Sequence, residues 1–371
     1  MLKRFTVENF KNFKDKTTLA FDQPANYEFN TEIVKDNCIT KGIILGINGS
    51  GKSNLALAIF DIVLHLTDKE KLYDKYQFYL NMDSSQNTAD FEYVFEFDKT
   101  EVIYRYKKSM PGFLVQESLT IAGNEVVYYD FGKQEGWTNL EGAENMQLRA
   151  ALTLGFETLS RVKYIKSNAI LRDNEVNRAF RAFVAFVDNM LMFYSLDQNR
   201  YQGFYLGTEN YTQGIIRENK VREFEGFLKE QGIEYHLIVS LLNGQPELFC
   251  QFKNGIAPFT SVASTGTRSL ALFYYWYIKM STASFVYVDE YDAFYHFELA
   301  QTLVELVKKL DSTQVFFSTH NTDLLSNDLL RPDAFFLIKD NQIHTFDKIT
   351  EKELRRAHNI QKMYKAGTFN E

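Results

Sequence analysis

The stretch Gly46-Ile47-Asn48-Gly49-Ser50-Gly51-Lys52-Ser53 decides the fold of this 371-residue chain. It matches the phosphate-binding loop G-x-x-x-x-G-K-[ST], whose glycines let the backbone curl around phosphate groups without a Cβ clash. The apolar run at 42–45 predicts a buried strand before the loop, and residues 54–64 predict a helix after it. A helix N-terminus behind such a loop directs backbone N–H groups and a positive dipole end at one point. The stretch therefore predicts a nucleoside triphosphate site.

Two side chains of this loop have expected roles. Lys52 is expected to reach the β- and γ-phosphates, and the hydroxyl of Ser53 is expected to bind Mg²⁺. The alternative, a glycine turn with a surface lysine, is disfavoured because a predicted strand and helix flank the loop. The expected nucleotide-binding residues of the loop are Gly46, Asn48, Gly49, Ser50, Gly51, Lys52, Ser53 and Asn54.

Composition sets limits on the class of protein. Hydrophobic residues make up 45% of the chain and there are only 5 prolines, which favours a globular core over long disordered linkers. The net charge of −7 excludes a global basic field for nucleic acid. Two cysteines cannot form a disulfide framework and suit a reducing cytosol. The N-terminus alternates like a strand rather than a signal peptide, and no run of about 18 apolar residues exists. We therefore expect a cytoplasmic protein without a membrane segment.

The chain divides into two similar ends and a different middle. Apolar alternation at 91–97, 102–106, 114–121 and 126–131 predicts an antiparallel sheet. Helical periodicity follows at 173–187, with Asp173 as the expected N-cap, and again at 219–231. From about residue 260, helices and apolar strands alternate as in an α/β fold. The expected units are an N-terminal lobe at 1–140, a mainly helical insertion or lid at 141–258, and a C-terminal lobe at 259–371.

A second part of the nucleotide site is expected near residue 289. The apolar strand 285–288 ends in Asp289 and Glu290, which are expected to hold Mg²⁺ and to act on the attacking water, respectively. The apolar strand 314–317 runs on to His320, and the spacing allows one helix and an adjacent parallel strand. Because ligands bind at the carboxyl ends of such strands, His320 is expected to sense the γ-phosphate. A purely structural histidine is the alternative.

A third part is the small, polar turn Ser264-Thr265-Gly266-Thr267 before an apolar helical run. Such a turn opens a helix and presents an anion-ready N-terminus. As an isolated helix cap it would carry no functional information. It lies 25 residues before Asp289, which leaves room for one helix between them.

These motifs together resemble ATP-binding-cassette (ABC) ATPases of the SMC/RecF type, and more narrowly the AAA15-type bacterial ATPases. The resemblance covers nearly the whole chain. It includes VENFKNF at 7–13, the loop at 46–53, the strand at 91–97, the turn at 264–267, the segments 289–296 and 318–320, and the tail at 355–369. It implies an α/β, ABC-type (SMC/RecF-like) P-loop head with an antiparallel β lobe and an inserted mixed helical lid. The middle of the chain lacks a heptad pattern, so no long coiled coil is expected.

The resemblance also implies a mechanism and partners. ATP and Mg²⁺ would be the ligands, with Lys52, Glu290 and His320 as catalytic residues and Ser53 and Asp289 on the metal. In such ATPases two heads stack head to tail, so Ser264 and Gly266 of one copy would close on the γ-phosphate held by Lys52 of another. A homodimer or higher homo-oligomer is therefore expected. Such ATPases often serve anti-phage or abortive-infection systems, for example PARIS, beside a separate nuclease or toxin.

Some features depart from the family pattern. The turn at 264 has Ala263 and Thr265 where a leucine and a second glycine are usual. The family also has a glutamine that joins Mg²⁺ to the insertion, and in this chain it could be Gln77 or Gln86.

One alternative function is a RecF-like, DNA-binding repair ATPase, which would use basic residues at 149–181. A solvated helix face is the simpler interpretation of that run. A transporter cassette is disfavoured by the long split between Lys52 and Asp289. A GTPase is disfavoured because no Asn-Lys-x-Asp guanine motif is present.

Overall fold

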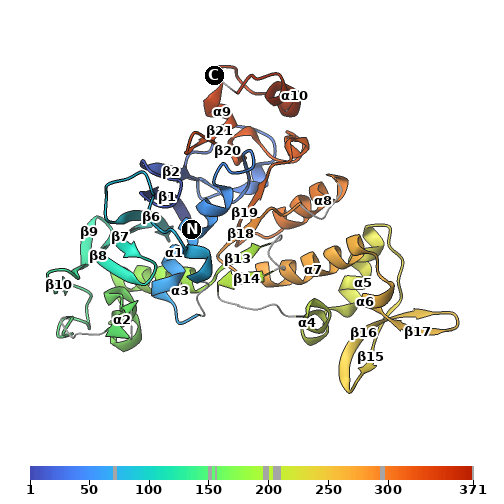
Figure 1. Ribbon diagram of the computed structural model, residues 1–371, viewed down its shortest axis with the longest axis horizontal. Helices are drawn as coiled ribbons and strands as arrows, with labels where there is room; N and C mark the ends of the chain where they lie inside the picture. Colours follow the sequence, from blue (N-terminus) through green and yellow to red (C-terminus); the bar gives the residue numbers. More distant parts are fainter. Residues whose placement is uncertain are drawn as a thin grey trace.

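A parallel sheet lies at the centre of the protein (Figure 1). The computed structural model describes residues 1–69, 73–148, 153–154, 157–194, 200–203, 210–292 and 297–369. The strand order is β14-β13-β18-β19-β5-β20-β21. Strands β13 to β20 in this order are parallel, and β14 and β21 pair antiparallel at the two edges. The strands span Arg200–Gly203, Met190–Tyr194, Phe285–Asp289, Gln314–Thr319, Lys41–Leu45, Phe335–Lys339 and Gln342–Thr345, in sheet order.

The inner strands of this sheet are continuous apolar runs because both of their faces are covered. Every residue of β5, β13, β18 and β19 is buried. Helix α1 (Lys52–Leu66) packs over β13, β18 and β19 on one face. Helices α7 (Thr265–Met280) and α8 (Phe297–Lys308) lie on the other side of the sheet (Figure 1). Strands from the first and last thirds of the chain therefore share one sheet.

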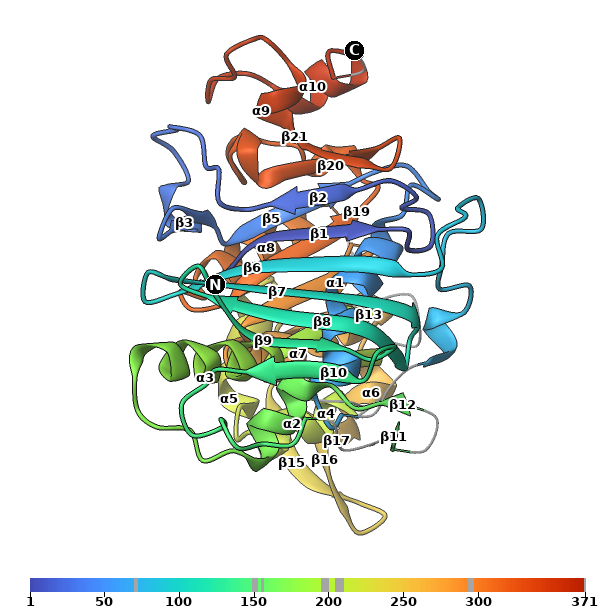
Figure 2. The same ribbon diagram turned by 90° about the vertical axis from the view of Figure 1, so that its left-hand side faces the viewer.

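An antiparallel sheet forms the lobe next to α1 (Figure 2). Its strand order is β10-β9-β8-β7-β6-β1-β2, so the N-terminal strand joins the hairpins that follow α1. Burial alternates along β6 and β7, which places one face of the sheet on the core and one toward solvent. The strands span Glu135–Thr138, Asn124–Asp130, Phe113–Ile121, Thr100–Met110, Ala89–Phe97, Leu2–Glu8 and Thr17–Ala20, in sheet order. The antiparallel prediction for this region is confirmed.

Two helices close the lower end of this lobe, α2 (Arg161–Asn168) and α3 (Glu175–Asp188). The N-cap of α3 is Asn174, whose side chain accepts a hydrogen bond from the backbone N–H of Asn177 at 2.8 Å. The prediction of Asp173 as the cap was therefore wrong by one residue. Asp173 instead pairs with Arg178 on the surface, at 3.2 Å.

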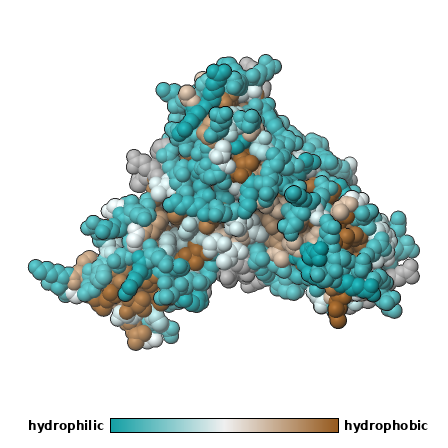
Figure 3. Space-filling view, turned by 180° about the vertical axis from the view of Figure 1, so that it is seen from behind, coloured by the Kyte–Doolittle hydropathy of each residue, from teal (hydrophilic) through white to brown (hydrophobic). Residues whose placement is uncertain are grey.

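A small three-stranded sheet projects from the side that carries α7 (Figure 1). It contains β15 (Leu237–Leu242), β16 (Gln245–Phe252) and β17 (Gly255–Pro258), and it packs on three short helices. These helices are α4 (Tyr211–Arg217), α5 (Val221–Glu230) and α6 (Phe259–Val262). Apolar residues gather on this projection in the space-filling view of Figure 3; the exposed ones are Val239, Leu241, Leu242, Phe252 and Ile256.

The remaining elements are short. Strands β3 (Val34–Lys35) and β4 (Cys38–Ile39) form one hairpin, and β11 (Thr153–Leu154) and β12 (Glu157–Thr158) form another. The chain ends in α9 (Phe346–Ile349) and α10 (Ile360–Lys365) above the central sheet. Four 3₁₀ turns lie at Thr31–Ile33, Tyr73–Tyr76, Thr322–Leu324 and Pro332–Ala334.

The predicted insertion at 141–258 needs one correction. Its strand β13 pairs in parallel with β18 over five residues and belongs to the central sheet, as does β14. The reason is that Met190–Tyr194 is a fully buried apolar run, which is stable only when both of its faces are covered. The remaining boundaries of the three predicted units stay a prediction. Among the described residues the longest helix is α7, with 16 residues, so none forms a long coiled coil. No helix among the described residues is long and apolar enough to cross a membrane.

Candidate nucleotide site

The three central motifs meet at one edge of the parallel sheet. The 46–53 loop follows β5, Asp289 ends β18, and His320 follows β19. These strands are neighbours: Leu45 pairs with Thr319, and Val288 pairs with Phe317. Because the strands are parallel, their carboxyl ends lie together, which is where ligands bind in open α/β sheets.

The loop conformation depends on glycine at particular positions. Gly49 and Gly51 have φ of 81° and 103°, in the left-handed region that side chains avoid. A Cβ on Gly51 would also collide with the amide nitrogen of Asn12, and one on Gly46 would collide with the hydroxyl of Ser50. That hydroxyl of Ser50 is buried and has no hydrogen-bond partner among the residues that the structure describes. An unpartnered buried donor inside a glycine loop is what a bound phosphate oxygen would satisfy.

Lys52 folds back over the loop. Its side chain is only 4% exposed and donates hydrogen bonds to the carbonyl oxygens of Gly46 at 2.9 Å and Ile47 at 3.3 Å. Its ammonium group also lies 3.3 Å from a carboxylate oxygen of Glu290. The hydroxyl of Tyr287, on β18, donates to the backbone carbonyl of Lys52 at 3.1 Å, which ties the start of α1 to the sheet.

Asp289 receives one hydroxyl on each carboxylate oxygen. Ser53 donates to Oδ2 and Ser318 donates to Oδ1, both at 2.6 Å. Burial raises the pKa of Asp289, while the hydrogen bonds from Ser318 and Ser53 oppose that shift. The Ser53 hydroxyl and the Asp289 carboxylate are hard oxygen donors in contact beside the loop. This donor set fits Mg²⁺, which binds through one or two carboxylates together with substrate phosphates.

Glu290 and His320 complete the group. Glu290 adopts φ of 50°, which turns the chain sharply at the end of β18. One oxygen of its carboxylate faces Lys52 and the other lies 3.1 Å from Nδ1 of His320. Glu290 is 14% exposed and His320 is 55% exposed, so the histidine stands at the solvent side of the group. A carboxylate in this position can orient and deprotonate a water molecule next to a bound phosphate.

Two residues near the site were not predicted to belong to it. Asn12 accepts a hydrogen bond from Asn54 at 2.7 Å and donates one to Asn341 at 2.8 Å, which links the loop helix to the N- and C-terminal ends. Ser318 donates to Asp289 and accepts a hydrogen bond from the backbone N–H of Glu290. Asn12 lies in the VENFKNF stretch and Ser318 in the segment before His320, but nothing in either stretch indicates these contacts.

The structure does not bring the turn at 264 to the loop within one chain. Ser264 caps α7 by accepting a hydrogen bond from the N–H of Thr267 at 3.1 Å, and Ser264 and Gly266 are exposed. The start of α7 lies beside α6, on the other side of the sheet from α1 (Figure 1). The two candidate glutamines are also exposed: the carbonyl of Gln77 accepts from Lys11, and Gln86 donates to Glu8. Neither contact singles out the glutamine that would join Mg²⁺.

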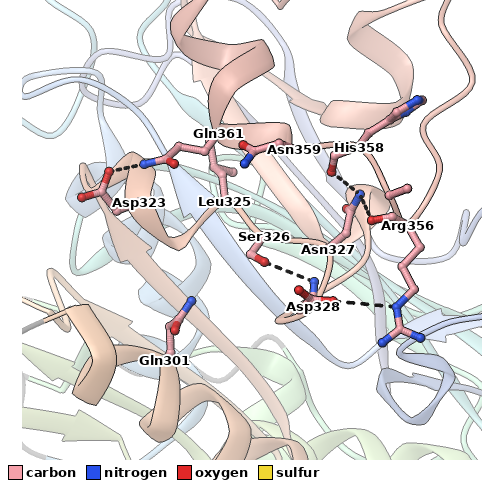
Figure 4. Close-up of a pocket in the computed structure, with 11 residues that line it drawn as sticks. Gln301, Asp323, Leu325, Ser326, Asn327, Asp328, Arg356, His358, Asn359 and Gln361 are labelled. Atoms are coloured by element: carbon pink, nitrogen blue, oxygen red, sulfur yellow. Dashed lines mark hydrogen bonds and ion pairs between the residues drawn. The ribbon is translucent and has the colours of Figure 1, made fainter.

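A cavity of about 600 Å³ opens next to the segment that follows His320 (Figure 4). It lies between the 323–328 loop and the C-terminal segment 356–361, with Gln301 of α8 at its side. Asn327 holds the C-terminal segment by donating to the carbonyl oxygens of Arg355 and His358, and Asp323 accepts from Gln361. None of the residues that line the cavity belongs to the 46–53 loop, and these hydrogen bonds join the tail to the loop after β19.

The basic run of the middle region is largely paired. Arg161 is buried and stacks over the ring of Tyr129, with 4.2 Å between the guanidinium carbon and the ring centre. Lys166 forms an ion pair with Asp188 at 2.6 Å. Lys163 pairs with Asp68, and Arg178 and Arg181 pair with Asp173. Arg149 lies outside the described residues, and so do residues 293–296 of the 289–296 segment. These pairs reduce the positive charge available to a DNA backbone.

A comparison with known protein families gives a match to this chain. A family model described as "AAA domain, putative AbiEii toxin, Type IV TA system" matches residues 43–326, about three quarters of the chain. The match includes the 46–53 loop, the turn at 264, Asp289, Glu290 and His320. No curated protein matches the chain. The predicted α/β fold with an antiparallel β lobe is confirmed.

Solved structures similar to the chain include SMC head domains. The SMC head domain from Thermotoga maritima is 15% identical, with a TM-score of 0.46, and the match covers 93% of this chain and 98% of that one. The Smc head domain from Pyrococcus furiosus, bound to the C-terminal domain of ScpA, is 13% identical, with a TM-score of 0.47. That match covers 94% of this chain and 97% of the archaeal chain.

Proposed function

This chain belongs to the AAA-domain family described as a putative AbiEii toxin of a type IV TA system, and on that premise we propose that it is a Mg²⁺-dependent ATP hydrolase. One observation carries the proposal: a glycine loop with its lysine, a hydroxyl–carboxylate pair and a glutamate–histidine pair converge at one edge of a parallel sheet. Structural ion pairs alone would not require loop glycines at positive φ or a buried Ser50 hydroxyl without a partner among the described residues.

Each group has a proposed part in the reaction. The backbone N–H groups of the loop and the Lys52 ammonium bind the phosphates, and Ser53 and Asp289 would hold Mg²⁺. When bound, the ion neutralises charge that develops on the phosphate oxygens. Glu290 accepts a proton from the attacking water, and its contacts with Lys52 and His320 fix where its two oxygens point. His320, at the solvent side, contacts the γ-phosphate.

Replacing Glu290 by glutamine tests the catalytic assignment. E290Q keeps the shape of the side chain but cannot take a proton, so kcat should fall by about a hundredfold or more while ATP binding persists. A matched control is Glu96→Gln, because Glu96 also pairs with a lysine, Lys3, at 3.1 Å, but lies on the antiparallel lobe. ATP turnover is measured by phosphate release and binding by equilibrium titration. Turnover by E290Q at the wild-type rate would show that the role given to Glu290 is wrong.

We further propose that the site is completed by a second copy of the chain. Ser264 and Gly266 are exposed at the start of α7, and α7 lies on the other side of the sheet from α1 (Figure 1). An exposed helix N-terminus can bind the phosphate held by another copy. ATP would then stabilise the dimer, and hydrolysis would release it.

A mixing experiment tests this shared site. Lys52→Ala removes the phosphate-loop half of the shared site and Ser264→Arg removes the half at the start of α7, so each variant alone should be inactive. A heterodimer of the two contains one site with both halves intact, so an equimolar mixture should recover part of the wild-type turnover. A mixture that stays as inactive as its components, while wild-type protein is active, contradicts the shared site.

The cellular role we propose is in bacterial anti-phage defence, with this chain as the sensor or scaffold for a separate nuclease or toxin. The family description, which names a putative AbiEii toxin of a type IV TA system, supports a defence role. Expression of this chain alone should be harmless, and co-expression with the protein encoded beside it should restrict phage growth. A chain that kills cells or blocks phage without a partner would refute the two-component arrangement.

A further inference from the structure

Ser318 lies on the strand next to β18, beside Asp289, which ends β18, and Glu290, which follows it. It is fully buried near the end of β19, opposite Ile44 of β5. On its other side, the pairing of Val288 with Phe317 places Asp289 and Ser318 at the next position of two adjacent parallel strands. A hydroxyl at this position can reach the side chain of Asp289 and the backbone that follows it.

The Ser318 hydroxyl makes two contacts that fix its orientation. Its single proton is donated to Oδ1 of Asp289 at 2.6 Å. Its oxygen accepts a hydrogen bond from the backbone N–H of Glu290 at 2.9 Å. A serine hydroxyl has one donor and two acceptor sites, so both contacts form together. The donor contact leaves the opposite carboxylate oxygen, Oδ2, for Ser53 and the proposed metal.

The second contact stabilises an unfavourable backbone conformation. Glu290 is not a glycine, yet its φ is 50°, and such conformations cost on the order of 1 kcal/mol or more. The N–H of Glu290 and the N–H of Tyr291 both donate to Ser318, the first to its hydroxyl and the second to its carbonyl oxygen at 3.3 Å. The sharp turn at Glu290 is what lets its carboxylate face Lys52 and His320. Ser318 therefore holds the turn that aims the proposed base.

We propose that Ser318 is a positioning residue that holds the Mg²⁺-binding carboxylate of Asp289 and the base Glu290 in a fixed arrangement relative to each other. The proposal rests on the proposed ATP hydrolysis. Ser318 touches neither substrate nor metal and acts only through the two acidic residues. The alternative is that Ser318 is a buried hydroxyl that stabilises the sheet and has no influence on the reaction.

Removing the hydroxyl tests these two roles. In S318A, Asp289 loses a charge-assisted hydrogen bond and Glu290 loses the acceptor that holds its turn. We expect kcat to fall by about tenfold to hundredfold with KM for ATP changed by less than about threefold. S318T restores a hydroxyl and should recover most of the rate. The matched control is Thr313→Val, which also removes a buried hydroxyl, one that lies within hydrogen-bond distance of the carbonyl oxygens of Met280 and Ala283 just before β19.

A second measurement does not depend on turnover. Binding of a fluorescent ATP analogue is titrated with MgCl₂, and half-saturating Mg²⁺ is compared among the variants. S318A should require about tenfold more Mg²⁺ than wild type or T313V, whereas analogue binding without Mg²⁺ should be unchanged in all three. Binding of the analogue without Mg²⁺ also shows that S318A is folded. If S318T fails to fold, the comparison of S318A with T313V still tests the positioning role of Ser318.

The outcomes separate this inference from the proposed function. If wild-type protein does not hydrolyse ATP, the proposed function fails. If wild-type protein is active and S318A matches T313V in kcat and in Mg²⁺ requirement, the positioning role is overturned and the proposed function stands.

Discussion

Replacing Lys108 by methionine would remove one partner of a fully buried ion pair between α1 and the antiparallel lobe. The ammonium group of Lys108, on β7, lies 2.6 Å from Oδ1 of Asp61 on α1, and both side chains are 0% exposed. The hydroxyls of Tyr79 and Tyr106 also donate to the Asp61 carboxylate, each at 2.9 Å. Because α1 begins with Lys52 and Ser53, this pair holds the helix of the candidate site against the lobe.

The structure sets the expected size of the effect. K108M leaves the Asp61 carboxylate buried without a counter-charge, and breaking a buried pair in this way costs about 3–5 kcal/mol of folding free energy. The two tyrosine hydroxyls remain as donors to Asp61, so we expect the lower end, about 3 kcal/mol. The double variant Asp61→Asn with Lys108→Met removes both charges and keeps an oxygen acceptor for a tyrosine. It should recover most of the loss.

The adjacent residue provides the control. Lys107 pairs with Asp90 at 2.5 Å, but these side chains are 45% and 34% exposed. Exposed pairs contribute less than about 1 kcal/mol, so K107M should change stability little although the two lysines are neighbours on one strand. Free energies of unfolding come from urea denaturation followed by fluorescence and circular dichroism. If K108M is no more destabilising than K107M, burial does not control the strength of this pair and the reasoning fails.

Two further predictions concern the strand and loop of the candidate site. Gly51→Ala should cost at least about 2 kcal/mol of stability and abolish nucleotide binding, because residue 51 has φ of 103° and the new Cβ would collide with Asn12. Gly49 also has a positive φ, but the space around it is open, so Gly49→Ala should cost only about 1 kcal/mol. Both costs are measured by denaturation without nucleotide, and equal costs would contradict the collision. Burial lowers the pKa of Lys41, at the start of β5, from 10.5 to about 8. Between these two values the unfolded chain holds a proton that the folded chain has lost, so stability should rise with pH by about 3 kcal/mol relative to Lys41→Met. A constant difference between wild type and K41M from pH 7.5 to 10 would refute this.

Much of the site could be predicted from the sequence because its signals are local. The glycine loop carries its own conformational requirements, and the apolar runs before Asp289 and His320 predict buried strands without reference to the rest of the chain. The alternation at 91–131 likewise predicted the antiparallel sheet, since each hairpin is formed by neighbouring segments.

Other features were not accessible from the sequence. Strand β13 was assigned to an insertion because its partner β18 lies far along the chain, and no local pattern shows that two distant apolar runs pair. The cap of α3 was misplaced because Asp173 and Asn174 are both good caps, and only the helix geometry distinguishes them.

The amino-acid sequence by itself determined that a phosphate loop, two carboxylates and a histidine follow buried strands, because hydrophobic periodicity and glycine positions act over a few residues. Only the tertiary structure decided that Ser318 lies against Asp289, that Asn12 supports the loop helix, and that α7 lies on the other side of the sheet from α1. The physical reason is that strand order and register are set by long-range packing of the whole core. A shift of one residue would turn the Ser318 hydroxyl to the opposite face of the sheet.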